Sequence, residues 1–141
     1  MTTADELVSK DFLVRIKPAK DLADKEWVES EYDLKEAEHE LAGGGDKWAT
    51  VKSYYAMFHA AKAVLFLLGL KERSHYAVGE TLDALSKQGR IESNYVNDFS
   101  AARNAREGAD YKYAHTEAVA EQMVGMAEEF IKRMKTLAKN L

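Results

Sequence analysis

Residues 47–68 form a segment whose apolar side chains cover most of the circumference of a helix. One face carries Val51, Tyr54, Phe58, Ala61, Leu65 and Leu68, and the neighbouring Met57, Val64 and Leu67 widen it. Gly69 follows and ends the helical pattern. Because a helix this apolar must be covered on several sides, the segment predicts the central helix of a bundle.

Other helical segments are expected around this central one, separated by glycines and by the single proline, Pro18. The first spans about residues 22–42, and Asp46, Ser74, Ser93 and Thr116 are predicted N-caps of the four that follow. We find no sustained strand alternation. The chain of 141 residues is therefore predicted to be all-α, a single-domain bundle of about five helices with a four-helix up-and-down core.

The first nineteen residues are harder to assign than the rest. Residues 1–19, which include "DFLVRIKPA", are expected to be an N-terminal arm or a short helix, and residues 20–141 to be the helical bundle. The start "MTTADELVSKDF" lacks the pattern of a secretion signal, and no apolar run approaches the roughly 20 residues needed to cross a bilayer. We therefore expect a cytoplasmic protein that does not enter the membrane.

Bulk charge and the absence of cysteine exclude several functions. The net charge of −4 offers no reason for generic DNA binding, and a chain without cysteine has neither disulfides nor thiolate metal sites. Glu36 and His39, and likewise Glu72 and His75, have the Glu-x-x-His spacing of di-iron bundles. The first pair is expected to face water and the second follows a helix break, so we expect no metal site and no cofactor.

The central helix has a polar edge that is a candidate binding surface. Lys52, Tyr55, His59 and Lys62 lie within about 80° of one another on a helical wheel. Tyr55 and His59 are four residues apart, which places them on successive turns. This edge is either the solvated side of a largely buried helix or one wall of a groove.

Arg106 is the second candidate, because it falls on an apolar face of the helix expected from about Ser93. Its neighbours on that face are Tyr95, Phe99, Ala102, Ala109 and Tyr113. An arginine directed toward protein is costly unless it is paired. Three arrangements would satisfy Arg106: an internal brace with Asp110, a place in a dimer seam, or a groove that receives an anionic ligand. Arg103 lies beside Asp110 at the border of the same face.

Three segments, "SYYAMFHAAKAVLFLLG", "RSHYAV" and "ARNAREGADY", resemble the HEPN domain family in their order and spacing. The likeness spans about Trp27 to Phe130. It implies a helical bundle that forms homodimers, and many family members are paired with a minimal nucleotidyltransferase in toxin–antitoxin systems. Catalytic members are metal-independent ribonucleases that use an arginine followed, after about four to six residues, by a histidine.

This chain lacks that histidine, since the corresponding positions hold Gly108, Ala109 and Asp110 after Arg103, and Tyr111, Lys112 and Tyr113 after Arg106. We therefore expect a homodimer that binds a nucleotide, RNA or a nucleotidyltransferase partner, as one half of a toxin–antitoxin pair. The alternatives are a metal-independent endoribonuclease and a non-catalytic dimerising adaptor. The expected ligand-binding residues are Arg103, Arg106, Asp110, Tyr55, His59 and Lys62.

Overall fold

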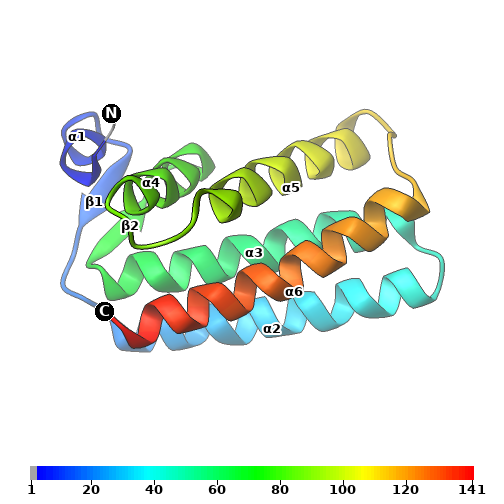
Figure 1. The fold of residues 1–141 in the computed structure, drawn as a ribbon, viewed down its shortest axis with the longest axis horizontal. Helices are drawn as coiled ribbons and strands as arrows, with labels where there is room; N and C mark the ends of the chain where they lie inside the picture. Colours follow the sequence, from blue (N-terminus) through cyan, green and yellow to red (C-terminus); the bar gives the residue numbers. More distant parts are fainter. Residues whose placement is uncertain (1–2) are drawn as a thin grey trace.

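The computed structural model describes residues 3–141 and gives this range six helices and two short strands. In chain order they are α1 (Ala4–Ser9), β1 (Leu13–Arg15), α2 (Lys20–Ala42), α3 (Asp46–Leu67), β2 (Leu70–Glu72), α4 (His75–Lys87), α5 (Ser93–Tyr111) and α6 (Glu117–Lys139). Helices α2, α3, α5 and α6 run alternately up and down (Figure 1), which confirms the predicted all-α fold. None of the described helices is both long and apolar enough to span a membrane.

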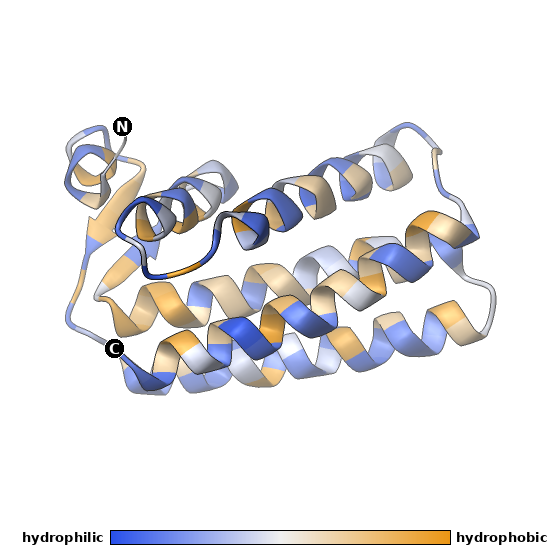
Figure 2. Cartoon of the chain, viewed as in Figure 1, coloured by the Kyte–Doolittle hydropathy of each residue, from blue (hydrophilic) through white to orange (hydrophobic). Residues whose placement is uncertain are grey.

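Helix α3 is the centre of the bundle, as its sequence predicts. It packs against α2, α5 and α6, and most of its side chains are buried. Figure 2 shows few strongly hydrophilic residues along α3, whereas α2, α5 and α6 mix hydrophilic and hydrophobic residues. Aromatic rings link three of these helices, because the Phe99 centroid lies 5.7 Å from that of Tyr54 and 5.8 Å from that of Phe130. This packing fixes the position of α5 relative to α3.

Two of the four predicted helix caps are correct. The Ser74 hydroxyl accepts the N–H of residue 77, and the Thr116 hydroxyl accepts the N–H of residue 119, each at 3.2 Å. Asp46 and Ser93 were wrongly predicted as caps, because the preceding residue takes the N-cap position in each case. Asp46 still lies in the first turn, where the helix dipole favours a carboxylate.

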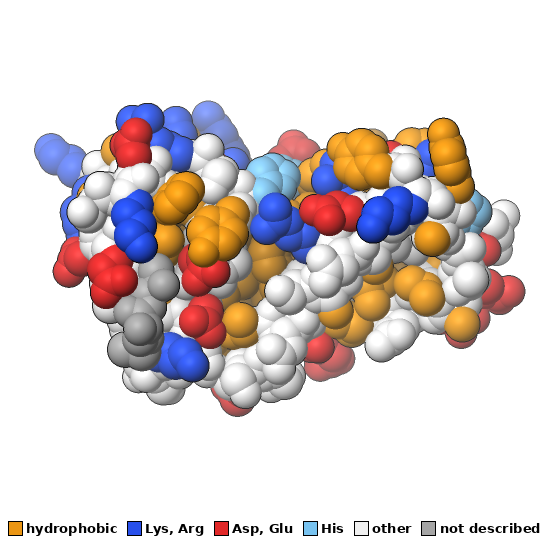
Figure 3. Space-filling view, turned by 90° about the horizontal axis from the view of Figure 1, so that it is seen from above, with side chains coloured by type: hydrophobic (Ala, Val, Ile, Leu, Met, Phe, Trp, Pro, Cys, Tyr) orange, Lys and Arg blue, Asp and Glu red, His pale blue; other side chains and the backbone are white. Residues whose placement is uncertain are grey.

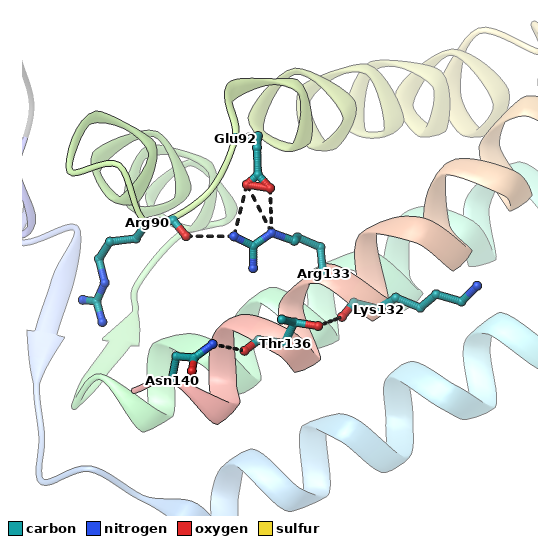
Figure 4. A network of polar contacts seen from close by, with 6 residues as sticks. All are labelled: Arg90, Glu92, Lys132, Arg133, Thr136 and Asn140. Carbon is teal, nitrogen blue, oxygen red and sulfur yellow. Dashed lines mark hydrogen bonds and ion pairs between the residues drawn. The ribbon is translucent and has the colours of Figure 1, made fainter.

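The beginning of α5 is tied to α6 by a single arginine (Figure 4). Arg133 Nε donates to Glu92 Oε1 at 2.8 Å, and its Nη2 donates to Glu92 Oε2 and to the Arg90 carbonyl, both at 3.1 Å. The hydrogen bond from Arg133 holds the pKa of Glu92 below its usual range. Because Glu92 is the N-cap of α5, this contact joins the start of that helix to α6.

The described part of the N-terminal arm, residues 3–19, packs on the body of the same chain. Leu7 and Leu13 are almost fully buried in the main core. Strand β1 pairs antiparallel with β2, with Leu13 opposite Glu72, and the N–H of Ile16 donates to the carbonyl of Gly69 at 2.9 Å. The sequence did not predict β2, because a three-residue strand is too short to show alternation.

Candidate functional site

Arg106 lies between two tyrosine rings. Its guanidinium carbon is 5.3 Å from the centroid of Tyr55 and 5.2 Å from that of Tyr111, within the range of cation–π contacts. Nη2 donates to the Tyr55 hydroxyl at 2.8 Å and to the Tyr111 hydroxyl at 3.3 Å. Only 16% of the Arg106 side chain is exposed, so the guanidinium faces protein instead of bulk solvent.

The hydrogen-bonding capacity of Arg106 is not filled by these contacts. Its Nε is buried and has no hydrogen-bond partner within residues 3–141. Asp110 Oδ2 is 3.5 Å from Nη2, which is an ion-pair distance and longer than a good hydrogen bond. Since an unpaired buried donor costs about 1–3 kcal/mol, this arginine is not a fully satisfied internal brace.

Arg103 adds a second guanidinium one turn earlier on α5. Its Nε is 3.6 Å from Glu107 Oε1, and about a third of its side chain is exposed. Arg103 also lines an open groove of about 240 Å³ between α4 and α5, whose other lining residues include Tyr76, Glu80 and Asp83. Figure 3 shows Lys and Arg side chains on this face beside a histidine, together with Asp and Glu side chains and exposed hydrophobic side chains.

His75 is a residue that we did not include in the predicted site. Its ring stacks on Phe58 with centroids 4.2 Å apart, and its Nδ1 lies 3.1 Å from the Tyr54 hydroxyl. Burial and the positive charges of Arg103 and Arg106 lower the pKa of His75, which favours the neutral imidazole. Burial raises the pKa of Tyr54 to about 12, so its hydroxyl keeps its proton and can orient the imidazole.

His59 and Lys62 are directed to a different part of the molecule. His59 Nδ1 lies 2.6 Å from Glu26 and its Nε2 lies 3.5 Å from Asp33, both on α2. Lys62 Nζ is 3.2 Å from Glu26 and 3.5 Å from Glu72. Burial alone would raise the pKa of Glu26, but the hydrogen bond from His59 and the charge of Lys62 outweigh it, and the pKa is lowered. Both side chains therefore already have partners on α2 or β2.

The structure thus divides the six residues predicted for the site. Tyr55, Arg106 and Asp110 are in contact, and Arg103 stands one turn away on α5. The hydrogen bonds and ion pairs of the other two, His59 and Lys62, go to α2 and β2.

The residues of the two Glu-x-x-His pairs contact other side chains or solvent. Glu36 lies 3.5 Å from Lys52, and His39 is exposed. Glu72 faces Lys62, while His75 is held by Tyr54, and no described group of three acids and histidines could hold a metal ion.

Comparison with known proteins shows the family to which this chain belongs. Residues 25–137 match the model of the HEPN domain, so the chain belongs to the HEPN family, as the sequence motifs suggest. A relative named "Putative toxin MJ0605", from Methanocaldococcus jannaschii, is 34% identical over 95 residues. The match covers 66% of this chain and 71% of the relative.

Proposed function

We propose that this HEPN protein binds a phosphate-bearing ligand, either a nucleotide or an RNA segment, in the site around Arg106. The observation that carries the proposal is a guanidinium held between two tyrosine rings with a buried Nε that has no partner among the described residues. A planar guanidinium suits phosphate oxygens, and tyrosine rings suit stacked bases. Tyr111 and Tyr113, with 66% and 83% exposure, extend this aromatic border at the end of α5.

We further infer that the protein has a toxin-like role in the cytoplasm, acts as a homodimer and pairs with a minimal nucleotidyltransferase. The name of its relative supports the toxin-like part, and the family resemblance supports the dimer and the partner. A non-catalytic dimerising adaptor is the alternative in which Arg106 has only a structural role. Binding of phosphate-bearing ligands distinguishes the two.

The test is fluorescence anisotropy with a labelled single-stranded RNA 12-mer and with a labelled ATP analogue, in low salt with chelator. Arg106→Ala and Arg106→Lys should each weaken binding at least tenfold, because a charge-assisted hydrogen bond contributes about 1.5–3 kcal/mol. The matched variants Arg15→Ala and Arg15→Lys change an exposed arginine on β1 and should have no effect. Full affinity and full dimerisation in both Arg106 variants would reject the site.

A metal-independent endoribonuclease is the second candidate, favoured by the surroundings of His75. A neutral imidazole whose pKa is lowered by burial and by the charges of two arginines can transfer a proton at a phosphodiester, and the arginines can balance the charge of that phosphodiester. Incubation with total RNA in chelator tests this: cleavage should be lost in His75→Gln while binding of the RNA 12-mer persists. The comparison variant is His59→Ala, and cleavage that depends on His59 instead would contradict the assignment to His75. Intact RNA at high protein concentration would remove the enzyme hypothesis.

A further inference from the structure

His75, the first residue of α4, turns one edge of its ring toward the protein interior. Its Nδ1 lies 3.1 Å from the hydroxyl of Tyr54, a residue with 0% exposure, and its ring stacks on Phe58. His75 itself is exposed at the surface. The accessible part of the ring is therefore the edge opposite Tyr54, which carries Nε2, and Nε2 has no hydrogen-bond partner in the described part of the chain.

The direction of the hydrogen bond between Tyr54 and His75 follows from the burial of Tyr54. A buried tyrosine hydroxyl needs an acceptor for its single proton, and within residues 3–141 the acceptor that this hydroxyl reaches is Nδ1 of His75. If Nδ1 carried a proton, it would donate to the Tyr54 oxygen, and the hydroxyl proton would be buried without an acceptor. The Tyr54 hydroxyl therefore donates to Nδ1, and the proton of the neutral ring is on Nε2.

The surroundings of His75 keep its ring neutral. Burial lowers the pKa of His75 below its ordinary value, and the charges of Arg103 and Arg106 lower it further. The N-terminus of a helix also disfavours a positive charge, and His75 is the first residue of α4. A neutral ring with its proton on Nε2 is a hydrogen-bond donor at that atom, and it lacks the free Nε2 lone pair that a general base requires.

His75 and Arg106 belong to one cluster of side chains, although they come from different helices. The ring of Tyr54, whose hydroxyl contacts His75, lies 5.3 Å from the ring of Tyr55, measured between centroids. The Tyr55 hydroxyl in turn accepts a hydrogen bond from Arg106. Helices α4 and α5 contact each other and lie on the same side of α3 (Figure 1). Two adjacent tyrosines of α3 thus hold the His75 ring and the Arg106 guanidinium.

We propose that His75 is a further ligand-binding residue of the Arg106 site, a neutral donor whose Nε2–H binds a phosphate oxygen, and that Tyr54 is its positioning residue. This inference rests on the proposed binding of a phosphate-bearing ligand. A neutral donor adds a hydrogen bond to those of the arginines without adding a further positive charge beside them. The assignment also separates the two candidate functions, because a protonated Nε2 supports binding, whereas an unprotonated Nε2 supports proton transfer.

The position of the ring proton is tested first, without any ligand. Long-range proton–nitrogen NMR spectra at about pH 8, where histidine is neutral, distinguish protonated from unprotonated ring nitrogens, and His75→Gln identifies the His75 signals by their loss. In the unaltered chain we expect Nδ1 to be unprotonated and Nε2 to be protonated. Tyr54→Phe should produce a mixture of both tautomers, and Tyr32→Phe, which removes an exposed hydroxyl, should change neither signal. A proton on Nδ1 in the unaltered chain, or unchanged His75 signals in Tyr54→Phe, overturns the proposal.

Binding of the RNA 12-mer and of the ATP analogue then tests the donor. His75→Phe keeps a ring that can stack on Phe58 but has no N–H, so it should weaken binding about tenfold, the loss expected for one hydrogen bond to a charged group. His75→Gln offers an amide N–H near the position of Nε2 and should keep an affinity close to that of the unaltered chain. His39→Ala, at an exposed histidine of α2, is the control and should have no effect.

The outcomes distinguish a failure of this inference from a failure of the site. If Arg106→Ala weakens binding and His75→Phe does not, the inference is overturned and the proposed function stands. Equal losses in His75→Phe and His75→Gln also overturn the inference, because the glutamine N–H then replaces nothing. If Arg106→Ala binds with full affinity, or neither probe binds the unaltered chain, the proposed function fails, and the role of His75 as a donor fails with it.

Discussion

Removing one hydroxyl from Tyr55 separates the two structural explanations of Arg106. Tyr55→Phe keeps the ring that stacks with the guanidinium but deletes the acceptor at 2.8 Å. Asp110→Asn keeps the shape of the side chain and deletes the charge at 3.5 Å. If Arg106 is an internal brace with Asp110, the second change should be the costlier one. In the structure the shorter contact belongs to Tyr55.

The expected magnitudes follow from burial and distance. A hydrogen bond to a charged group that is largely shielded from water contributes about 1.5–3 kcal/mol, so Tyr55→Phe should lower the free energy of unfolding by about 2 kcal/mol. The Arg106–Asp110 pair is longer, and its side chains are 16% and 27% exposed, so Asp110→Asn should cost at most about 1 kcal/mol. For a chain of this size, about 1 kcal/mol shifts Tm by about 2–4 °C.

Thermal unfolding followed by circular dichroism measures both variants. We expect Tm to fall by about 4–8 °C for Tyr55→Phe and by less than about 4 °C for Asp110→Asn. Tyr32→Phe is the matched control, because Tyr32 is 60% exposed and this change removes a hydroxyl from the surface of the protein. A larger fall in Tm for Asp110→Asn than for Tyr55→Phe would refute this reasoning and would support the interpretation of Arg106 as an internal brace with Asp110. A double-mutant cycle of Tyr55→Phe with Arg106→Met should show that the stability lost in Tyr55→Phe comes from the hydrogen bond between Arg106 and Tyr55.

Three further predictions concern the turn after α3 and two titrating groups. Gly69→Ala should lower the free energy of unfolding, measured in urea, by about 1 kcal/mol or more beyond the loss caused by Gly89→Ala. Both glycines have a positive φ, but a Cβ on Gly69 would lie 2.7 Å from a carbonyl oxygen, whereas a Cβ on Gly89 would meet open space. In an NMR titration, His75 should titrate below its ordinary pKa of about 6.5. Its contribution to stability is therefore full above about pH 6.5 and falls as the pH drops toward the pKa of His75 in the folded protein. Arg103→Gln should raise the titration midpoint of His75, and an unchanged midpoint would contradict an effect of the Arg103 charge on His75. The pKa of Glu26 is lowered from 4.5, so Glu26 contributes stability that is present above pH 4.5 and is lost as the pH falls through its pKa in the folded protein. Glu26→Gln should therefore be less stable at pH 7 and should lose less stability in acid than the unaltered chain. Parallel pH profiles of stability for the two proteins would count against the pairing of Glu26 with His59 and Lys62.

The sequence by itself determined the fold class, because helix periodicity is a local property. The apolar circumference of residues 47–68 requires neighbours on several sides, and α3 has them. Ser74 and Thr116 cap their helices as predicted, because a cap depends only on the next three residues. The inward direction of Arg106 also follows from its position on the wheel, and the structure agrees.

Only the tertiary structure decided which polar groups meet. His59 and Tyr55 lie on the same edge of α3, yet His59 is paired with carboxylates of α2 while Tyr55 binds Arg106 of α5. His75 stacks on Phe58 because the α3–β2 turn brings the start of α4 back over α3, and this position brings it under the influence of the charges of Arg103 and Arg106. Helical spacing determines the face that a side chain occupies, but the packing of helices determines which partner it finds there, and no local pattern contains that information.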